Sequence, residues 1–202
     1  MTDLAKIKVK ALSKAIQDKS FRDALHRNAH TAVKDAFDFQ VPEGMVLHVV
    51  EQSPEHQVFV IPQKPDEVSE GATAEDILHL LTKDFPKLSD ELSKRMTGYA
   101  DILSQIWSDP DFENRFKENP RGILTEKTAI PIDEKTHFTV QWEDDHNSYL
   151  VLPNLTADDE LTDEELEMVA GGELFTVIGI LIGAGVPIWI CAAIVSIASI
   201  SW

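Results

Sequence analysis

Apolar residues recur at helical spacing in two separate parts of the chain. Residues four apart share one face of a helix, so each set predicts a helix that packs against a core. Between the two sets, residues 74–106 carry leucines and isoleucines at similar spacing and predict one or two further amphipathic helices. The two apolar stripes consist of Ile16, Phe21 and Leu25, and of Trp107, Phe112 and Phe116.

Each helical part is followed by two short runs that are rich in β-branched and aromatic residues. Such runs predict strands. Residues 143–147, Glu-Asp-Asp-His-Asn, separate the last two runs and predict a hairpin loop. The four predicted strands cover residues 45–50, 57–61, 137–142 and 148–152.

The second part of the chain resembles the first. The segment FRDALHRN from Phe21 is similar to FENRFKEN from Phe112, and in each copy a proline follows 41 positions after that phenylalanine. Two copies are too few for a solenoid, so we expect a duplicated α+β domain with compensating shifts inside it. The other correspondences pair Val41-Pro42 with Ile130-Pro131, His48 with His137, and Val58–Pro62 with Tyr149–Pro153.

Charge is distributed unevenly along the 202 residues. The net charge is -17, and residues 1–172 hold all 18 basic and 34 of the 35 acidic side chains, whereas residues 174–202 hold none. No basic surface exists that could bind phosphates, which argues against nucleic-acid binding. The uncharged end is long enough to span a bilayer, so one interpretation is a tail-anchored membrane protein with an acidic partner-binding domain.

The candidate chemistry of the chain is sparse. Cys191 is the only cysteine, which excludes an internal disulfide and a zinc site with two thiolates. Among the seven histidines, only His26 and His30 show the i, i+4 spacing of a helical metal pair. No phosphate-binding loop or nucleophile elbow is present. We therefore expect no enzymatic activity, no cofactor and no metal site.

The charge changes abruptly at a Gly-Gly pair. Thr162 and Glu165 form a capping box that predicts a short helix, and Gly171 predicts its end. Leu166 and Val169 fall on one face of that helix. Two consecutive glycines can be an ordinary linker, or they can thread the narrow cleft of a protease.

The segment ELTDEELEMVAGG resembles the double-glycine leader end of precursors of ribosomally made, post-translationally modified peptides. This resemblance implies cleavage between Gly172 and Glu173 by a peptidase-containing transporter. It also implies recognition of apolar residues upstream. Those positions fall on Val169, Leu166 and Leu161, while a fourth falls on the charged Asp158 and departs from the pattern.

Residues 107–169, and more faintly 16–62, resemble the α subunit of nitrile hydratase in the segments RFKENPRGILTEKTAIPI, HFTVQWEDDHNSYLVLPNL and LTDEELEMV. The resemblance identifies the nitrile-hydratase-like leader peptides of proteusin precursors. The metal-binding cluster C-x-x-C-S-C of the hydratase is missing, because no cysteine precedes position 191. A degenerate accessory subunit of a hydratase is a third interpretation.

These observations predict an α+β leader of duplicated helix and β-hairpin units joined by helices, followed by a flexible or helical apolar core peptide. The first repeat is expected at 1–63, an acidic linker with amphipathic helices at 64–106, the second repeat at 107–172, and the core at 173–202. The expected precursor is cytoplasmic, and the expected product is an exported bacteriocin that acts on membranes.

The leader is expected to bind a peptide-modifying enzyme and the Gly-Gly peptidase transporter. A single cysteine allows at most one thioether ring, and dehydration, epimerisation, methylation and cyclisation all stay open. The candidate modification sites in the core are Thr176, Cys191, Ser196, Ser199 and Ser201.

Overall fold

The computed structural model of the protein describes residues 3–53, 55–66, 68–82, 90–128 and 132–153. These residues form seven helices and four strands. In chain order the elements are α1 (Asp3–Gln17), α2 (Lys19–Arg27), α3 (Ala29–Phe37), β1 (Val46–Gln52), β2 (His56–Ile61), α4 (Ala74–Thr82), α5 (Asp90–Ser108), α6 (Pro110–Glu118), α7 (Pro120–Thr128), β3 (His137–Trp142) and β4 (Asn147–Pro153).

The elements recur at a constant spacing of 91 positions. Helix α6 begins 91 positions after α2, α7 begins 91 positions after α3, and β3 and β4 begin 91 positions after β1 and β2. The last residues of α1 and α5, Gln17 and Ser108, are also 91 positions apart. We call α1–α3 with β1 and β2 the first repeat, and α5–α7 with β3 and β4 the second repeat.

The constant spacing corrects the internal shifts that the sequence comparison predicted. The equivalent of Val41 in the second repeat is Ile132 rather than Ile130, and Val41 and Ile132 are both buried. The equivalent of His48 in the second repeat is Thr139 rather than His137. The same spacing relates the two strand pairings. Val46 faces Asn147 in one pair, and their equivalents 91 positions away, His137 and His56, face each other in the other pair. A shifted alignment would break this correspondence.

The hairpin expectation for residues 143–147 is wrong. Strand β3 does not pair with β4; instead β1 pairs with β4 and β2 pairs with β3, in two parallel two-stranded sheets. Each sheet therefore takes one strand from each repeat. Val58, Phe59, Val60 and Ile61 are all buried, which is the pattern of a parallel strand covered on both faces rather than of a hairpin with one solvated face.

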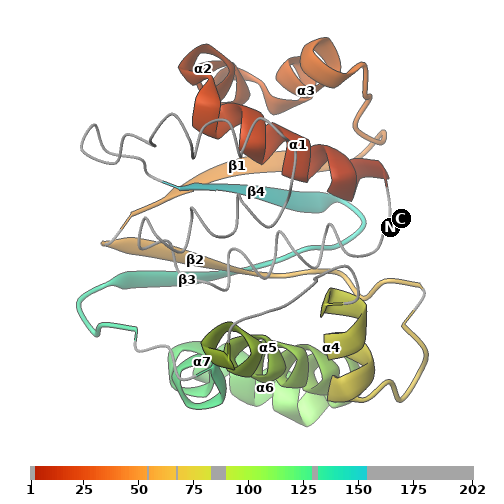
Figure 1. The fold of residues 1–202 in the computed structure, drawn as a ribbon, viewed down its shortest axis with the longest axis vertical. Helices are drawn as coiled ribbons and strands as arrows, with labels where there is room; N and C mark the ends of the chain where they lie inside the picture. The colour runs from red at the N-terminus through yellow and green to blue at the C-terminus, as the bar shows by residue number, and fades with distance from the viewer. Residues whose placement is uncertain (1–2, 54, 67, 83–89, 129–131, 154–202) are drawn as a thin grey trace.

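The two sheets lie between two groups of helices (Figure 1). Helices α1–α3 lie beyond β1 and β4, and helices α4–α7 lie beyond β2 and β3. The large apolar side chains of the helices meet the strands: the ring of Phe59 on β2 lies 5.7 Å from that of Tyr99 on α5 and 6.2 Å from that of Phe116 on α6. Both predicted stripes enter this core, with Trp107 and Ile16 only partly buried.

Capping residues set the ends of the short helices. Asn28 ends α2 and also begins α3, where its side-chain oxygen accepts a hydrogen bond from the Thr31 N–H at 3.0 Å. Asn119 accepts from the Gly122 N–H at 3.1 Å at the equivalent place in the second repeat. Asp109 is the N-cap of α6 and Pro110 its first residue, because proline fits the first turn of a helix. The breaks at Asn28 and Asn119 each turn the chain between two helices of nine residues.

Helix α5 crosses the boundary that the sequence predicted between residues 106 and 107. Its C-terminal part, up to Ser108, is the equivalent of α1. Among the helices that the structure describes, none combines the length and the apolar character that a membrane span requires.

Candidate functional site

All the site residues predicted from the sequence follow residue 153 and lie outside the described part of the chain. They are the cleavage residues Gly171, Gly172 and Glu173, the recognition residues Leu161, Leu166 and Val169, and the modification candidates Thr176, Cys191, Ser196, Ser199 and Ser201. The structure therefore bears on the domain that precedes these residues and on the strand that leads to them.

Strand β4 is the last described element before the predicted cleavage site. It pairs with β1 along seven residues, from Val46 opposite Asn147 to Gln52 opposite Pro153. Leu150 and Leu152 on this strand are buried in the core. The C-terminal segment is thus attached to a strand that lies beside the first strand of the fold.

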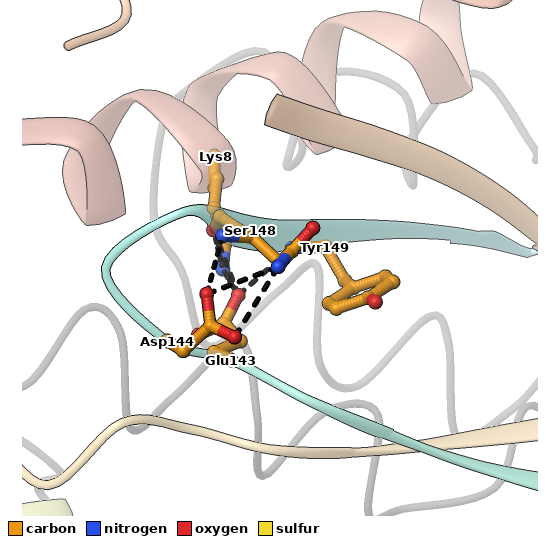
Figure 2. Close-up of polar contacts among 6 residues, drawn as sticks. Lys8, Glu143, Asp144, Ser148 and Tyr149 are labelled. Atoms are coloured by element: carbon orange, nitrogen blue, oxygen red, sulfur yellow. Dashed lines mark hydrogen bonds and ion pairs between the residues drawn. The ribbon is translucent and has the colours of Figure 1, made fainter. Parts of the chain in front are cut away.

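A buried polar cluster holds the start of β4 against α1 (Figure 2). The ammonium group of Lys8 donates to the carboxylate of Glu143 at 2.5 Å and to the hydroxyl of Ser148 at 3.2 Å. The same Glu143 oxygen accepts from the Ser148 hydroxyl at 2.7 Å and from the Tyr149 N–H at 2.8 Å. The side chains of Lys8 and Glu143 are 5% and 12% exposed, so the pair is largely shielded from water.

Asp144 shapes the turn between β3 and β4. Its carboxylate accepts hydrogen bonds from the N–H groups of His146 and Asn147, at 2.7 and 2.8 Å. The bond from His146 is the main reason that the pKa of Asp144 lies below its usual value. Burial, followed by the negative charges of Asp144 and Glu143, raises the pKa of Tyr149. The turn therefore stays anionic beside a neutral phenol.

The positions related to this pair by 91 residues carry uncharged groups. Tyr99 stands 91 positions after Lys8, Gln52 stands 91 before Glu143, and both Tyr99 and Gln52 are buried. The charged pair, with one residue from each repeat, thus corresponds to a phenol and an amide that also come one from each repeat. Sequence reasoning missed Lys8 because it belongs to a run of lysines, and its partner Glu143 is 135 positions away.

The histidines contact different partners. His26 and His30 do not share a helix, since α2 ends before Asn28 and α3 begins after it. The ring of His26 lies 3.0 Å from the carboxylate of Glu51, while Nε2 of His30 accepts from the Leu47 N–H at 3.3 Å. The predicted i, i+4 pair is therefore split by a cap that the spacing alone does not reveal.

Two further histidine contacts lie on the strands. The His48 ring stacks on Tyr149 with centroids 4.8 Å apart, and its Nε2 lies 3.0 Å from Oδ1 of Asn147. The rings of His56 and His137 are 4.9 Å apart on neighbouring strands. Within the described ranges, no three histidine, cysteine or acidic side chains converge as a metal site would require.

A pocket of 530 Å³ opens on the first repeat, between α3 and the loop before β1. It is lined by polar and charged side chains together with Val41, Pro42 and Met45. The remaining lining residues are His30, Thr31, Lys34, Gln40, Glu43 and Gly44.

Comparison with known proteins gives one informative similarity. The chain is 28% identical over 92 residues to polytheonamide B of Bacterium symbiont subsp. Theonella swinhoei (strain pTSMAC1). The match covers 41% of this chain and 63% of that protein, so the chain spans less than two thirds of its relative. No protein-family model matches the chain.

This similarity supports the coarse class that the leader resemblance indicated, a precursor of a modified natural-product peptide. It also favours a substrate over an enzyme. The cleavage position, the transporter and the activity of the product remain predictions.

Proposed function

We propose that the chain is a proteusin-type precursor whose leader, residues 1–172, binds maturation enzymes and is removed by cleavage after Gly172. Residues 173–202 then form the released peptide, which a peptide-modifying enzyme has altered. A Gly-Gly peptidase transporter cuts the precursor in the cytoplasm and exports the product, a bacteriocin that acts on membranes.

The similarity to polytheonamide B carries this proposal. The distribution of charge supports it independently, because every basic residue lies before Gly171 and the side chains after Glu173 are uncharged. A leader with a net charge of -16 would keep an apolar peptide in solution until it is cut. Tethering would raise the concentration of the core at an enzyme bound to the leader, so weak contacts to the core would suffice.

The fold of the leader is compatible with a tethering role. Strand β4 is fixed at its start by Lys8 and Glu143 and along its length by β1. An enzyme that binds the helices or the sheet edges of the leader would therefore hold a defined attachment point, Pro153, from which the remaining chain extends. The chain has no cysteine before Cys191, so it lacks the thiolate cluster of the hydratase. We therefore assign a docking role to the hydratase-like part of the chain.

Mass spectrometry of producing cells tests the proposal. We expect a free peptide that begins at Glu173, with a mass that differs from residues 173–202 by the modification, and tandem fragmentation would locate the change. Loss of water would place dehydration at Thr176 or at a serine, and retention of a free thiol would leave Cys191 outside a thioether ring.

Matched variants separate cleavage from anchoring. Gly172→Val should block release because a side chain then enters the narrow cleft of the peptidase, whereas Thr156→Ala, outside the recognition helix, should leave release unchanged. Recovery of only the uncut wild-type chain in the membrane fraction would refute the precursor and favour the tail-anchored alternative.

A further inference from the structure

The two repeats carry different side chains at one helix position that lies beside a turn. His30 in α3 and Arg121 in α7 are equivalents, 91 positions apart, each at the second residue of its helix. The guanidinium of Arg121 donates to the carbonyl oxygens of Asp133 and Thr136, the latter at 2.7 Å. It also lies 5.9 Å from the centroid of the Phe138 ring. Arg121 therefore joins its helix to the turn that leads into β3.

The first repeat contains a turn at the equivalent place, closed by the equivalent hydrogen bond but without the arginine. The Met45 N–H donates to the Pro42 carbonyl at 3.1 Å, as the Thr136 N–H donates to the Asp133 carbonyl at 3.0 Å. Pro42 and Met45 are the equivalents of Asp133 and Thr136, so the two carbonyls that Arg121 caps have counterparts at the ends of this turn. Gly44 takes a φ of +84°, whereas its equivalent Lys135 does not take a positive φ, so the central peptides of the two turns are oriented differently.

The pocket of 530 Å³ lies where Arg121 lies in the other repeat. Its lining includes His30, Pro42 and Met45, the three equivalents of the arginine and of its two acceptors. The imidazole of His30 is shorter than an arginine side chain, and its Nε2 accepts from the Leu47 N–H instead of donating to the turn. Among the described residues, no side chain donates to the Pro42 and Met45 carbonyls.

From this comparison we infer that the pocket of the first repeat binds the guanidinium of an arginine side chain presented by a partner protein. The planar guanidinium has several N–H donors and can contact two carbonyl oxygens at once, as Arg121 does within the chain. Glu43 and Lys34 also line the pocket, and their opposite charges do not distinguish arginine from lysine. The preference for arginine therefore comes from the positions of the two carbonyl acceptors. The net charge of -17 favours the approach of a basic partner surface.

This inference extends beyond the precursor proposal and does not depend on it, because it rests on the two repeats alone. The test uses the full-length chain and N-acetyl-arginine methylamide, with N-acetyl-lysine methylamide as the matched probe. Two-dimensional amide NMR should show saturable shifts at Thr31, Gly44 and Leu47 with the arginine probe at millimolar concentration. The lysine probe should give clearly smaller shifts.

Two substitutions at one position give the decisive contrast. His30→Arg supplies the guanidinium from within the chain, so the arginine probe should no longer bind. His30→Ala leaves the pocket open, so binding should persist. Arg121→His should open the equivalent place in the second repeat and add shifts at Gly122 and Phe138, and circular dichroism would verify that each variant is folded.

Three results would overturn the inference: no saturable shift in the wild-type chain, equal binding of both probes, or undiminished binding to a folded His30→Arg variant. If Arg121→His unfolds the chain, the comparison of His30→Arg with His30→Ala still decides the question, because both changes are at an exposed residue of the first repeat.

Discussion

Lys8 and Glu143 form an ion pair of 2.5 Å although 135 residues separate them in the chain. The pair joins the first helix to the turn before the last strand, so it links the two ends of the described fold. A buried pair is strongly destabilising to break, since the remaining charge loses its partner while it stays shielded from water.

The first prediction concerns this pair. Lys8→Met should lower the free energy of unfolding by about 3 kcal/mol, because Glu143 stays buried without its cation. Adding Glu143→Gln should recover part of that loss, since a neutral amide still accepts from Ser148 and Tyr149. Urea denaturation of the two single variants and the double variant measures the coupling. Additive effects of the two changes would contradict the prediction.

The second prediction concerns a close helix contact. A Cβ at Gly98 in α5 would lie 2.0 Å from the carbonyl oxygen of Lys127 in α7, an impossible approach unless the helices separate. Gly98→Ala should therefore destabilise the fold by about 1–3 kcal/mol, although alanine is the better helix former. Lys94→Ala on the exposed face of the same helix is the control. A stabilised Gly98→Ala variant in thermal denaturation would contradict the contact.

The third prediction concerns acid stability. Burial would raise the pKa of Glu51, but the hydrogen bonds and charges of Arg22 and His26 outweigh burial and hold it below its ordinary value of 4.5. The unfolded chain therefore binds this proton more readily, so the contribution of Glu51 to stability is present above about pH 4.5 and is lost as the pH falls through the lower folded value.

Glu51→Gln should consequently be less stable than the wild type at neutral pH and approach it in acid. Urea midpoints measured at several pH values would show this convergence. Glu70→Gln, which replaces an exposed carboxylate in the turn before α4, is the matched control and should run parallel to the wild type. A constant difference between Glu51→Gln and the wild type at every pH would contradict the assignment.

The fourth prediction follows from the exchange of strands between the repeats. If the chain is cleaved between residues 69 and 73, the two fragments should remain associated, because β1 pairs with β4 and β2 pairs with β3 across the cut. Size-exclusion chromatography should show one species that contains both fragments. Separation of the fragments without denaturant would indicate that each repeat completes its own sheet.

Local features of the fold could be predicted from the sequence, whereas the pairing of its strands could not. Asp109 and Pro110 begin a helix through interactions within one turn, and the predicted strand at 137–142 has the observed bounds. Strand pairing depends on segments that are 81 and 101 positions apart in the observed registers, and no short stretch of sequence contains both partners. A loop such as residues 143–147 is polar and rich in turn residues whether or not its flanking strands pair.

In the candidate site too, contiguous features could be predicted from the sequence, whereas features that depend on distant residues could not. The Gly171-Gly172 motif is readable because it is contiguous, but its structure lies outside the described residues. The His30 pocket was not predicted, because its significance depends on knowing that Arg121 is the equivalent residue. The sequence comparison aligned His48 with His137 and introduced a two-residue shift, and the strand register removes that shift.

The pairing of β1 with β4 also determines when the described domain can fold during synthesis. The first repeat emerges from the ribosome without a partner for either of its strands, since both partners lie between His137 and Pro153. Its sheets can close only after the chain has been translated as far as Pro153. The apolar residues 173–202 follow β4 in the chain, so the ribosome delivers them after the acidic domain to which they are joined has become able to complete its fold.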